Sequence, residues 1–265
     1  MLCLRKSSEK HMTQKIFMIS LMAVVLMAYT GSNQVRADED NESVLLAIVR
    51  DNPHDLENGR FLLEFLPCYY KYKTDTNDWV NAGLFLKMDA GPSWEFSVGS
   101  DFLSYQSPDF GLSDIYAGAK WKFYDKDSLT MAVTGYVDFP TGHTEFREPG
   151  IEPTLAFLIS RKIGDFELGA SVGSTYAADS QGDPCYLDFE ASLELDYTPD
   201  VHNSFSIFTY GYTPDQRTEG NPRITAGLDY TRTIDAHYAV GMTFLKGLSG
   251  KGKDWSMILY YDFSF

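Results

Sequence analysis

Apolar and polar residues alternate with a period of two along most of the chain from Gly59 onward. The stretch from Leu187 to Tyr197 is the clearest, because an acidic or serine residue follows almost every apolar one. Successive side chains of a β-strand point to opposite faces, so this stretch predicts a strand with one apolar and one acidic face. Comparable stretches bring the number of expected strands to about twelve.

The stretch from Trp255 to Phe265 places six large apolar side chains on one face of the expected strand. These are Trp255, Met257, Leu259, Tyr261, Phe263 and Phe265. An unbroken apolar face opposite small or polar residues is typical of a barrel strand in lipid. Tyrosine and tryptophan also gather toward strand ends, as the two interfacial belts of a membrane barrel require.

The links between the expected strands alternate between short and long. Short links at 89–93, 162–165 and 233–237 are separated by longer ones at 104–112, 141–152 and 213–221. Membrane barrels have short turns on the periplasmic side and longer loops outside. The sequence therefore predicts an all-β fold, a transmembrane antiparallel up-and-down β-barrel of about 12 strands over residues 59–265. A soluble two-sheet sandwich is the alternative, and it leaves the apolar face of every strand unexplained.

The first 37 residues have the pattern of a secretory signal peptide. Lys10 and Lys15 precede an apolar run from Ile16 to Ala28, and Val35-Arg36-Ala37 fits a cleavage site. The run is shorter than the roughly 20 residues of a spanning helix, which disfavours the alternative of a retained anchor. Met12 is a second possible start residue. Residues 38–58 form an acidic leader, expected as a loosely ordered segment, a plug in the lumen or a periplasmic contact site.

Charge excludes one class of partner. Residues 1–37 hold five of the 22 Lys and Arg and one of the 37 Asp and Glu, so the remainder carries a net charge of −19. Such a chain repels phosphate backbones, and nucleic acid is not an expected partner. Cys68 and Cys185 are the two cysteines beyond the signal peptide, and they are expected to stay unpaired on separate strands. The spacing of cysteine and histidine predicts neither a metal site nor a cofactor site.

Alternation assigns many acidic side chains to the inward face of the expected barrel. The principal acidic candidates are Glu64, Asp138, Glu167, Asp188, Glu190, Glu194, Asp196 and Asp229, with Lys120 and Lys122 as basic candidates. A water-filled bore lined in this way favours cations and neutral solutes. The alternative is a packed interior in which the carboxylates are paired or hydrogen-bonded, because twelve strands lie between filled and open barrels in size.

Sequence motifs give little support for catalysis. No H-E-x-x-H or phosphate-binding loop occurs, and no histidine alternates with a serine on an expected lipid face. We therefore expect a protein that is not an enzyme.

Three motifs carry a resemblance to a known family. They are the run from Phe110 to Phe123 with its G-x-x-D start, the P-T-G that follows Phe139, and Gly164-Asp165-Phe166 with Leu168. With them the chain resembles the bacterial outer-membrane proteins labelled for the MetA pathway of phenol degradation, or simply transporter. The resemblance implies an outer-membrane barrel that transports small hydrophobic or aromatic compounds. The family-motif residues are Gly111, Asp114, Gly118, Pro140, Thr141 and Gly142.

These motif residues also have a physical interpretation. Gly111 and Gly142 flank loops on the outer side, where positive φ is often needed, and Pro140 ends a strand. Asp114 and Lys120 are expected to face the lumen, either in structural salt bridges or as ligand contacts. Tyr261, Phe263 and Phe265 resemble the C-terminal signal read by the outer-membrane assembly machinery.

Two functional classes follow from these features. The first is a channel or transporter for small molecules in the outer membrane, with membrane lipid, the assembly machinery and a small solute as partners. The second is a non-conducting structural or surface-interaction barrel. A continuous bore would separate them.

The first prediction concerns processing. Cleavage after Ala37 should leave Asp38 as the first residue of a heat-modifiable protein in the outer-membrane fraction. N-terminal sequencing checks it; an intact Met1 or Met12, or recovery in the soluble fraction, would refute it.

Overall fold

The computed structural model describes residues 60–72, 79–106, 109–144, 146–177, 185–213, 223–249 and 255–265. The expected signal peptide and acidic leader lie outside these residues. Across the part described, no helix has the length and apolar character needed to cross a membrane.

Thirteen strand segments follow one another along the described chain. They are β1 (Phe61–Tyr72), β2 (Trp79–Asp89), β3 (Trp94–Gln106), β4 (Asp109–Leu112), β5 (Ile115–Lys126), β6 (Leu129–Phe139), β7 (Glu152–Ile163), β8 (Phe166–Ala177), β9 (Tyr186–Asp200), β10 (Asn203–Tyr212), β11 (Arg223–Thr233), β12 (Tyr238–Gly247) and β13 (Trp255–Ser264).

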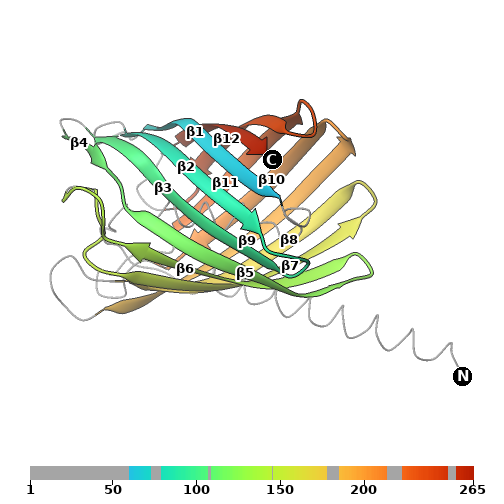
Figure 1. The fold of residues 1–265 in the computed structure, drawn as a ribbon, viewed down its shortest axis with the longest axis horizontal. Coiled ribbons are helices and arrows are strands. Elements are labelled where there is room, and N and C mark those ends of the chain that lie inside the picture. Colours follow the sequence, from blue (N-terminus) through green and yellow to red (C-terminus); the bar gives the residue numbers. More distant parts are fainter. Residues whose placement is uncertain are drawn as a thin grey trace, which may run out of the picture.

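The strands form one closed antiparallel barrel (Figure 1). Strands that are consecutive in sequence pair with one another, apart from β4 and β5, and β1 pairs with β13 to complete the ring. β4 and β5 both pair with β3, with Leu112 opposite Leu103 and Ile115 opposite Ser100, so they form two parts of one interrupted strand. The barrel therefore has twelve strand positions, and the predicted fold class is confirmed.

One expected loop is a strand hairpin instead. The sequence predicted a connection over 104–112, but β3 continues to Gln106 and β4 returns antiparallel beside it from Asp109. Strands pair through backbone hydrogen bonds, which do not require a row of apolar side chains. A search for lipid-facing apolar rows therefore misses a hairpin that extends beyond the apolar band of the barrel. Figure 1 shows β4 at the end of β3, on the rim formed by the longer connections.

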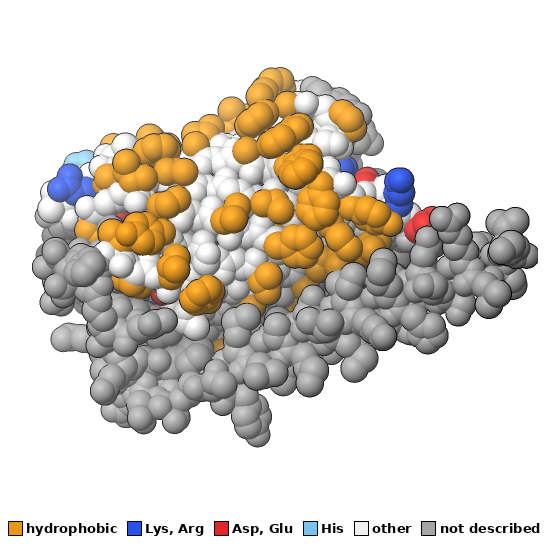
Figure 2. All heavy atoms as spheres, turned by 90° about the horizontal axis from the view of Figure 1, so that it is seen from below, with side chains coloured by type: hydrophobic (Ala, Val, Ile, Leu, Met, Phe, Trp, Pro, Cys, Tyr) orange, Lys and Arg blue, Asp and Glu red, His pale blue; other side chains and the backbone are white. Residues whose placement is uncertain are grey.

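The outer surface of the barrel is apolar. Leu155, Ile207 and Leu228 are each more than half exposed although they lie within strands. Figure 2 shows hydrophobic side chains across one face of the molecule, with charged side chains toward its two ends. Exposed apolar area of this extent on a closed barrel needs lipid around it, as in outer-membrane barrels.

An aromatic belt follows the end of the barrel with the short turns. Trp94 stacks on Trp121 with ring centroids 6.0 Å apart, Phe166 on Tyr197 at 4.8 Å, and Phe205 lies against Tyr230 at 5.0 Å. Each contact joins outward side chains of neighbouring strands, so the belt continues across strand boundaries. Aromatic rings in this position sit at the boundary between lipid and water.

Inside the barrel, large aromatic side chains lie over glycines of the adjacent strand. Four such pairs are directly opposite in register: Gly99 with Tyr116, Gly118 with Tyr136, Gly227 with Phe208, and Gly241 with Tyr260. A Cβ added to any of these glycines would overlap the paired ring. The missing side chain therefore lets each ring lie against the wall instead of projecting across the lumen.

The seam between β1 and β13 closes the ring at the short-turn end. Phe61 N–H donates to Phe265 O at 2.9 Å, Phe265 N–H donates to Phe61 O at 3.0 Å, and the two rings stack with centroids 5.9 Å apart. Cys68 lies on β1, while the exposed and free Cys185 precedes β9, and four strands separate β1 from β9 in the sheet order.

A second prediction tests the rings that lie over glycines. Gly241→Ala places a methyl group inside the Tyr260 ring, so the ring must leave the wall, at a cost of about 1–3 kcal/mol. Gly169→Ala is the matched control, because its added Cβ would lie 3.7 Å from Glu194 Cβ, an ordinary contact. Urea unfolding in detergent should show loss of stability in the first variant alone; equal stability of the two would contradict the packing described.

A third prediction tests the lipid-facing side of β9. Leu193→Arg puts a charge in lipid near the middle of the strand, where the cost is about 2–4 kcal/mol. Val201→Arg serves as control, since Val201 is 82% exposed in a turn. The heat-modifiability of the folded band on gels should fall for Leu193→Arg only, and unchanged folding would argue that Leu193 does not face lipid.

Candidate functional site

The inward face of the barrel carries the acidic candidates. On β9 the residues Asp188, Glu190, Glu194 and Asp196 alternate with Leu187, Phe189, Leu195 and Tyr197, which are exposed on the outside. The same alternation places the remaining acidic candidates inward, from β1, β6, β8 and β11, namely Glu64, Asp138, Glu167 and Asp229.

A polar row crosses five strands on the half of the lumen nearer the short turns. Glu167, Asp196, Ser206, Asp229 and Thr243 are opposite one another in register from β8 to β12. Asp229 accepts hydrogen bonds from the Tyr260 hydroxyl at 2.7 Å, from Thr231 at 3.1 Å and from Thr243. Three hydroxyl donors thus hold the carboxylate of Asp229 in place on the inward wall.

A second acidic level lies nearer the long connections. Asp138 on β6 is opposite Glu152 on β7 and also opposite Tyr116 on β5, and all three side chains are buried. On β9, Glu190 lies over Gly173 of β8, where a Cβ would overlap its carboxylate oxygen. Because Gly173 has no side chain, the Glu190 carboxylate can lie against the barrel wall.

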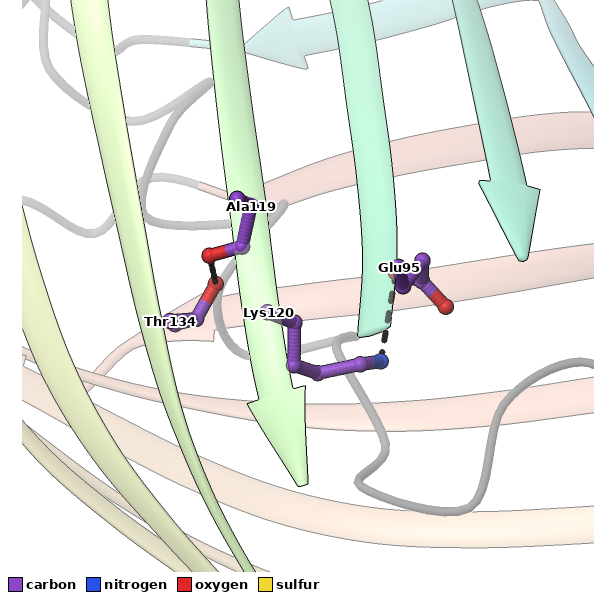
Figure 3. Close-up of polar contacts among 4 residues, drawn as sticks. All are labelled: Glu95, Ala119, Lys120 and Thr134. Carbon is purple, nitrogen blue, oxygen red and sulfur yellow. Dashed lines mark hydrogen bonds and ion pairs between the residues drawn. The ribbon is translucent and has the colours of Figure 1, made fainter. Parts of the chain in front are cut away.

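The basic candidates contact carboxylates. Lys120 Nζ lies 3.2 Å from Glu95 Oε1, and the two side chains are 5% and 7% exposed. Figure 3 shows this pair bridging β5 and β3, with the Thr134 hydroxyl donating to Ala119 O at 3.5 Å nearby. Lys122 pairs instead with Asp125 at 3.5 Å beside the turn. Lys120 is therefore in a structural salt bridge, and its partner is Glu95.

Two clusters of aromatic and aliphatic side chains also lie on the inward face. The first comprises Leu66, Phe208, Tyr210, Leu245, Ile258 and Tyr260, and the second Tyr116, Tyr136 and Ala156. Phe85 packs against both, with its ring centroid 5.5 Å from that of Tyr116. The clusters therefore join into one apolar lining beside the inward carboxylates.

The family-motif residues meet at the outer mouth. The connection after β6 folds back onto the break between β4 and β5, so that Asp114 accepts hydrogen bonds from Gly142 N–H at 2.7 Å and Glu148 N–H at 2.6 Å. Thr141 accepts one from Ile115 N–H at 3.0 Å. Pro140 begins this connection directly after β6 ends. Asp114 therefore binds backbone amides of a loop, where a salt bridge or ligand contact was expected.

Two motif glycines permit close approach, not positive φ. A Cβ on Gly142 would lie 2.7 Å from Leu112 O, and one on Gly111 would lie 2.9 Å from His143 Cβ. The glycines with positive φ among the described residues are Gly91 and Gly164. The prediction that Gly111 and Gly142 are needed for positive φ was therefore wrong. Gly118 belongs to a different contact, since it lies under the Tyr136 ring.

Sequence reasoning did not find His143 and Phe146 as part of this arrangement. His143 N–H donates to Leu112 O at 2.8 Å, and His143 Nδ1 accepts from Leu112 N–H at 2.9 Å. The one sequence feature that could have pointed to these two residues is their position just after the P-T-G motif. Hydrogen bonds between a loop and a strand end leave no periodic pattern in the sequence.

The assembly-signal candidates occupy the outer surface near the seam. Tyr261 and Phe265 are exposed, and the Phe263 ring meets Tyr238 edge-on with centroids 5.5 Å apart. As for metals, the described residues contain no group of three or more His, Cys, Asp or Glu arranged to hold an ion.

Solved structures share this fold. The COG4313 outer membrane channel from Pseudomonas putida F1 superposes with a TM-score of 0.65 at 15% sequence identity, covering 82% of this chain and all of that one. The KdgM porin has a TM-score of 0.55 at 8% identity, covering 77% of this chain and 99% of that one. At these identities the similarity concerns the fold, and it places the protein among outer-membrane barrels. No curated protein matches the sequence.

A family model described as "Putative MetA-pathway of phenol degradation" matches residues 60–244. The match begins with the first barrel strand and contains the acidic β9, the interrupted β4 and β5, and the loop contacts of Asp114. It confirms the resemblance drawn from the motifs, and the chain belongs to this family of outer-membrane barrels.

Proposed function

We propose that the protein is an outer-membrane channel for small molecules, with neutral aromatic or hydrophobic compounds as the preferred solutes. The observation that carries the proposal is the inward face of the closed barrel, where aromatic rings lie along the wall over glycines. Rings held in this way offer apolar surface to a passing solute without closing the passage. The family description, which refers to phenol degradation, agrees with an aromatic solute.

The burial of the inward side chains supports a narrow passage. Thr130, Thr134 and Thr243 are fully buried although they face inward, and the rings of Tyr136 and Tyr260 are nearly so. A wide water-filled bore would leave such side chains exposed. The proposed solutes are therefore small, and the acidic side chains beside the apolar lining favour neutral or cationic molecules over anions.

The same burial is the observation that favours a second candidate, a non-conducting barrel whose interior is packed and whose outer loops bind partners. The two candidates differ in a single measurement, because only the first passes current or solute across a membrane.

Transport, not catalysis, is the activity we propose. The histidines of the described part all contact backbone: His202 Nδ1 lies 3.1 Å from Thr233 O, His237 Nδ1 lies 2.9 Å from Ser264 O, and His143 binds Leu112. Each of these contacts fixes a turn or loop to a strand end. This use of histidine supports structural roles, since a general base must instead reach a nucleophile.

A fourth prediction tests the acidic lining through ion selectivity. Glu190→Gln with Glu194→Gln removes two inward charges with little change in shape, and should lower the cation-over-anion permeability ratio roughly twofold. Reversal potentials under a salt gradient in planar bilayers measure this ratio. The control is Asp127→Asn with Asp165→Asn, which removes two exposed turn charges and should leave the ratio unchanged.

Two results would count against the proposal. An unchanged ratio in the inward double variant would mean that Glu190 and Glu194 do not border the conducting path. A wild-type protein without conductance or solute flux would refute the channel and favour the non-conducting barrel.

A further inference from the structure

The connection between β6 and β7 turns inward at the outer mouth. Gly111 lies between Phe110 and Leu112, whose side chains are exposed on the outside, so its own side-chain position faces the lumen. A Cβ there would lie 2.8 Å from the Phe146 ring and 2.9 Å from His143. These two side chains therefore cover the lumen side of β4. We call residues 140–144 and 146–148 the folded loop.

An open strand edge explains why the folded loop lies there. β6 ends at Phe139 opposite Ile115, so β4 has β3 as its strand neighbour on one side and has no strand on the other among the described residues. Leu112 N–H and O both bond to His143, and Ile115 N–H bonds to Thr141. The folded loop thus satisfies backbone groups that a continuing β6 would have paired.

Asp114 fixes both ends of the folded loop. Its Oδ1 accepts from Gly142 N–H at one end and its Oδ2 from Glu148 N–H at the other. Hydrogen bonds to a charged carboxylate are stronger than those between neutral groups. The two oxygens of one side chain therefore hold the described residues from Gly142 to Glu148 in a compact turn against the wall.

We propose that Asp114 determines solute size in this channel, because it anchors the folded loop over the lumen side of β4 and so narrows the outer mouth. The inference rests on the proposed channel function. His143 and Phe146 form the surface of the constriction, and the family motif G-x-x-D with P-T-G encodes the anchor.

The first arm of the test reports on the anchor without requiring transport. Arg147 is exposed within the folded loop, so trypsin cleavage after Arg147 measures release of the loop from the wall. Asp114→Ala should raise the cleavage rate of the folded barrel about tenfold, because both charged hydrogen bonds are lost. Cleavage products are identified by mass spectrometry.

Two further variants serve as controls for the cleavage experiment. Asp200→Ala is the matched control, since Asp200 Oδ1 also accepts two backbone N–H bonds, from His202 at 2.8 Å and Asn203 at 2.9 Å, at the opposite end of the barrel. It should not change cleavage after Arg147. His143→Ala removes an exposed side chain of the folded loop and should raise cleavage even if Asp114→Ala impairs folding.

The second arm measures the size limit. Proteoliposome swelling with uncharged sugars, from a pentose to a trisaccharide, gives the rate for each solute relative to the smallest one. Asp114→Ala and His143→Ala should raise the relative rate of the largest sugar several-fold, while Asp200→Ala should leave the series unchanged.

The outcomes separate the two claims. Faster cleavage after Arg147 in Asp114→Ala together with faster uptake of the largest sugar supports the proposal. It is also supported if the wild type passes no sugar and the Asp114→Ala variant passes some. Unchanged cleavage overturns the anchor, and raised cleavage with an unchanged size limit overturns the constriction. Absence of flux in every variant overturns the proposed channel and the constriction together, while cleavage still decides the anchor.

Discussion

Every backbone amide and carbonyl that lies in lipid needs a hydrogen-bond partner within the protein, and the rest of this structure depends on that constraint. It requires the sheet to close, because an open edge in hydrocarbon would leave a row of unpaired groups. Closure is achieved between β1 and β13, where Phe61 and Phe265 exchange two backbone bonds. At the outer mouth, where β6 ends before β4 does, the folded loop supplies the missing partners for Leu112 and Ile115.

Closure in turn sets what can fill the interior. Inward side chains of twelve strands converge on a limited space, and the barrel accommodates large rings by pairing them with glycine on the next strand. Tyr260 shows how this arrangement combines with polarity: its ring lies over Gly241, while its hydroxyl donates to Asp229 two strands away. One side chain thus contributes both apolar wall surface and a donor that fixes a carboxylate. The inward carboxylates and the aromatic lining are therefore packed together, through side chains such as Tyr260 that contact both.

Much of this could be predicted from the sequence, because a barrel strand in lipid leaves a periodic record. The alternation from Leu187 to Tyr197 identified β9 and the direction of its carboxylates, and the final apolar row identified β13. Contacts without periodicity were not predictable in this way. The break at Ser113 and Asp114, the hairpin extension of β3 and the bonds of His143 depend on where neighbouring strands end, which the alternation of one strand does not contain. Gly111 and Asp114 were singled out by resemblance, but their contacts depend on the register of the surrounding strands.

The seam between β1 and β13 also has a consequence for how the barrel forms. Every other strand pair joins segments that are near neighbours in sequence, so those pairs can assemble hairpin by hairpin. The seam joins the two ends of the described chain, so it closes the longest loop and has the largest loop-closure entropy cost among the strand pairs. Until it forms, β1 and β13 each present an unpaired edge to other chains, which is the interval in which misassembly competes with folding. The stacked rings of Phe61 and Phe265 therefore stabilise the contact that ends this interval, the one that completes the barrel.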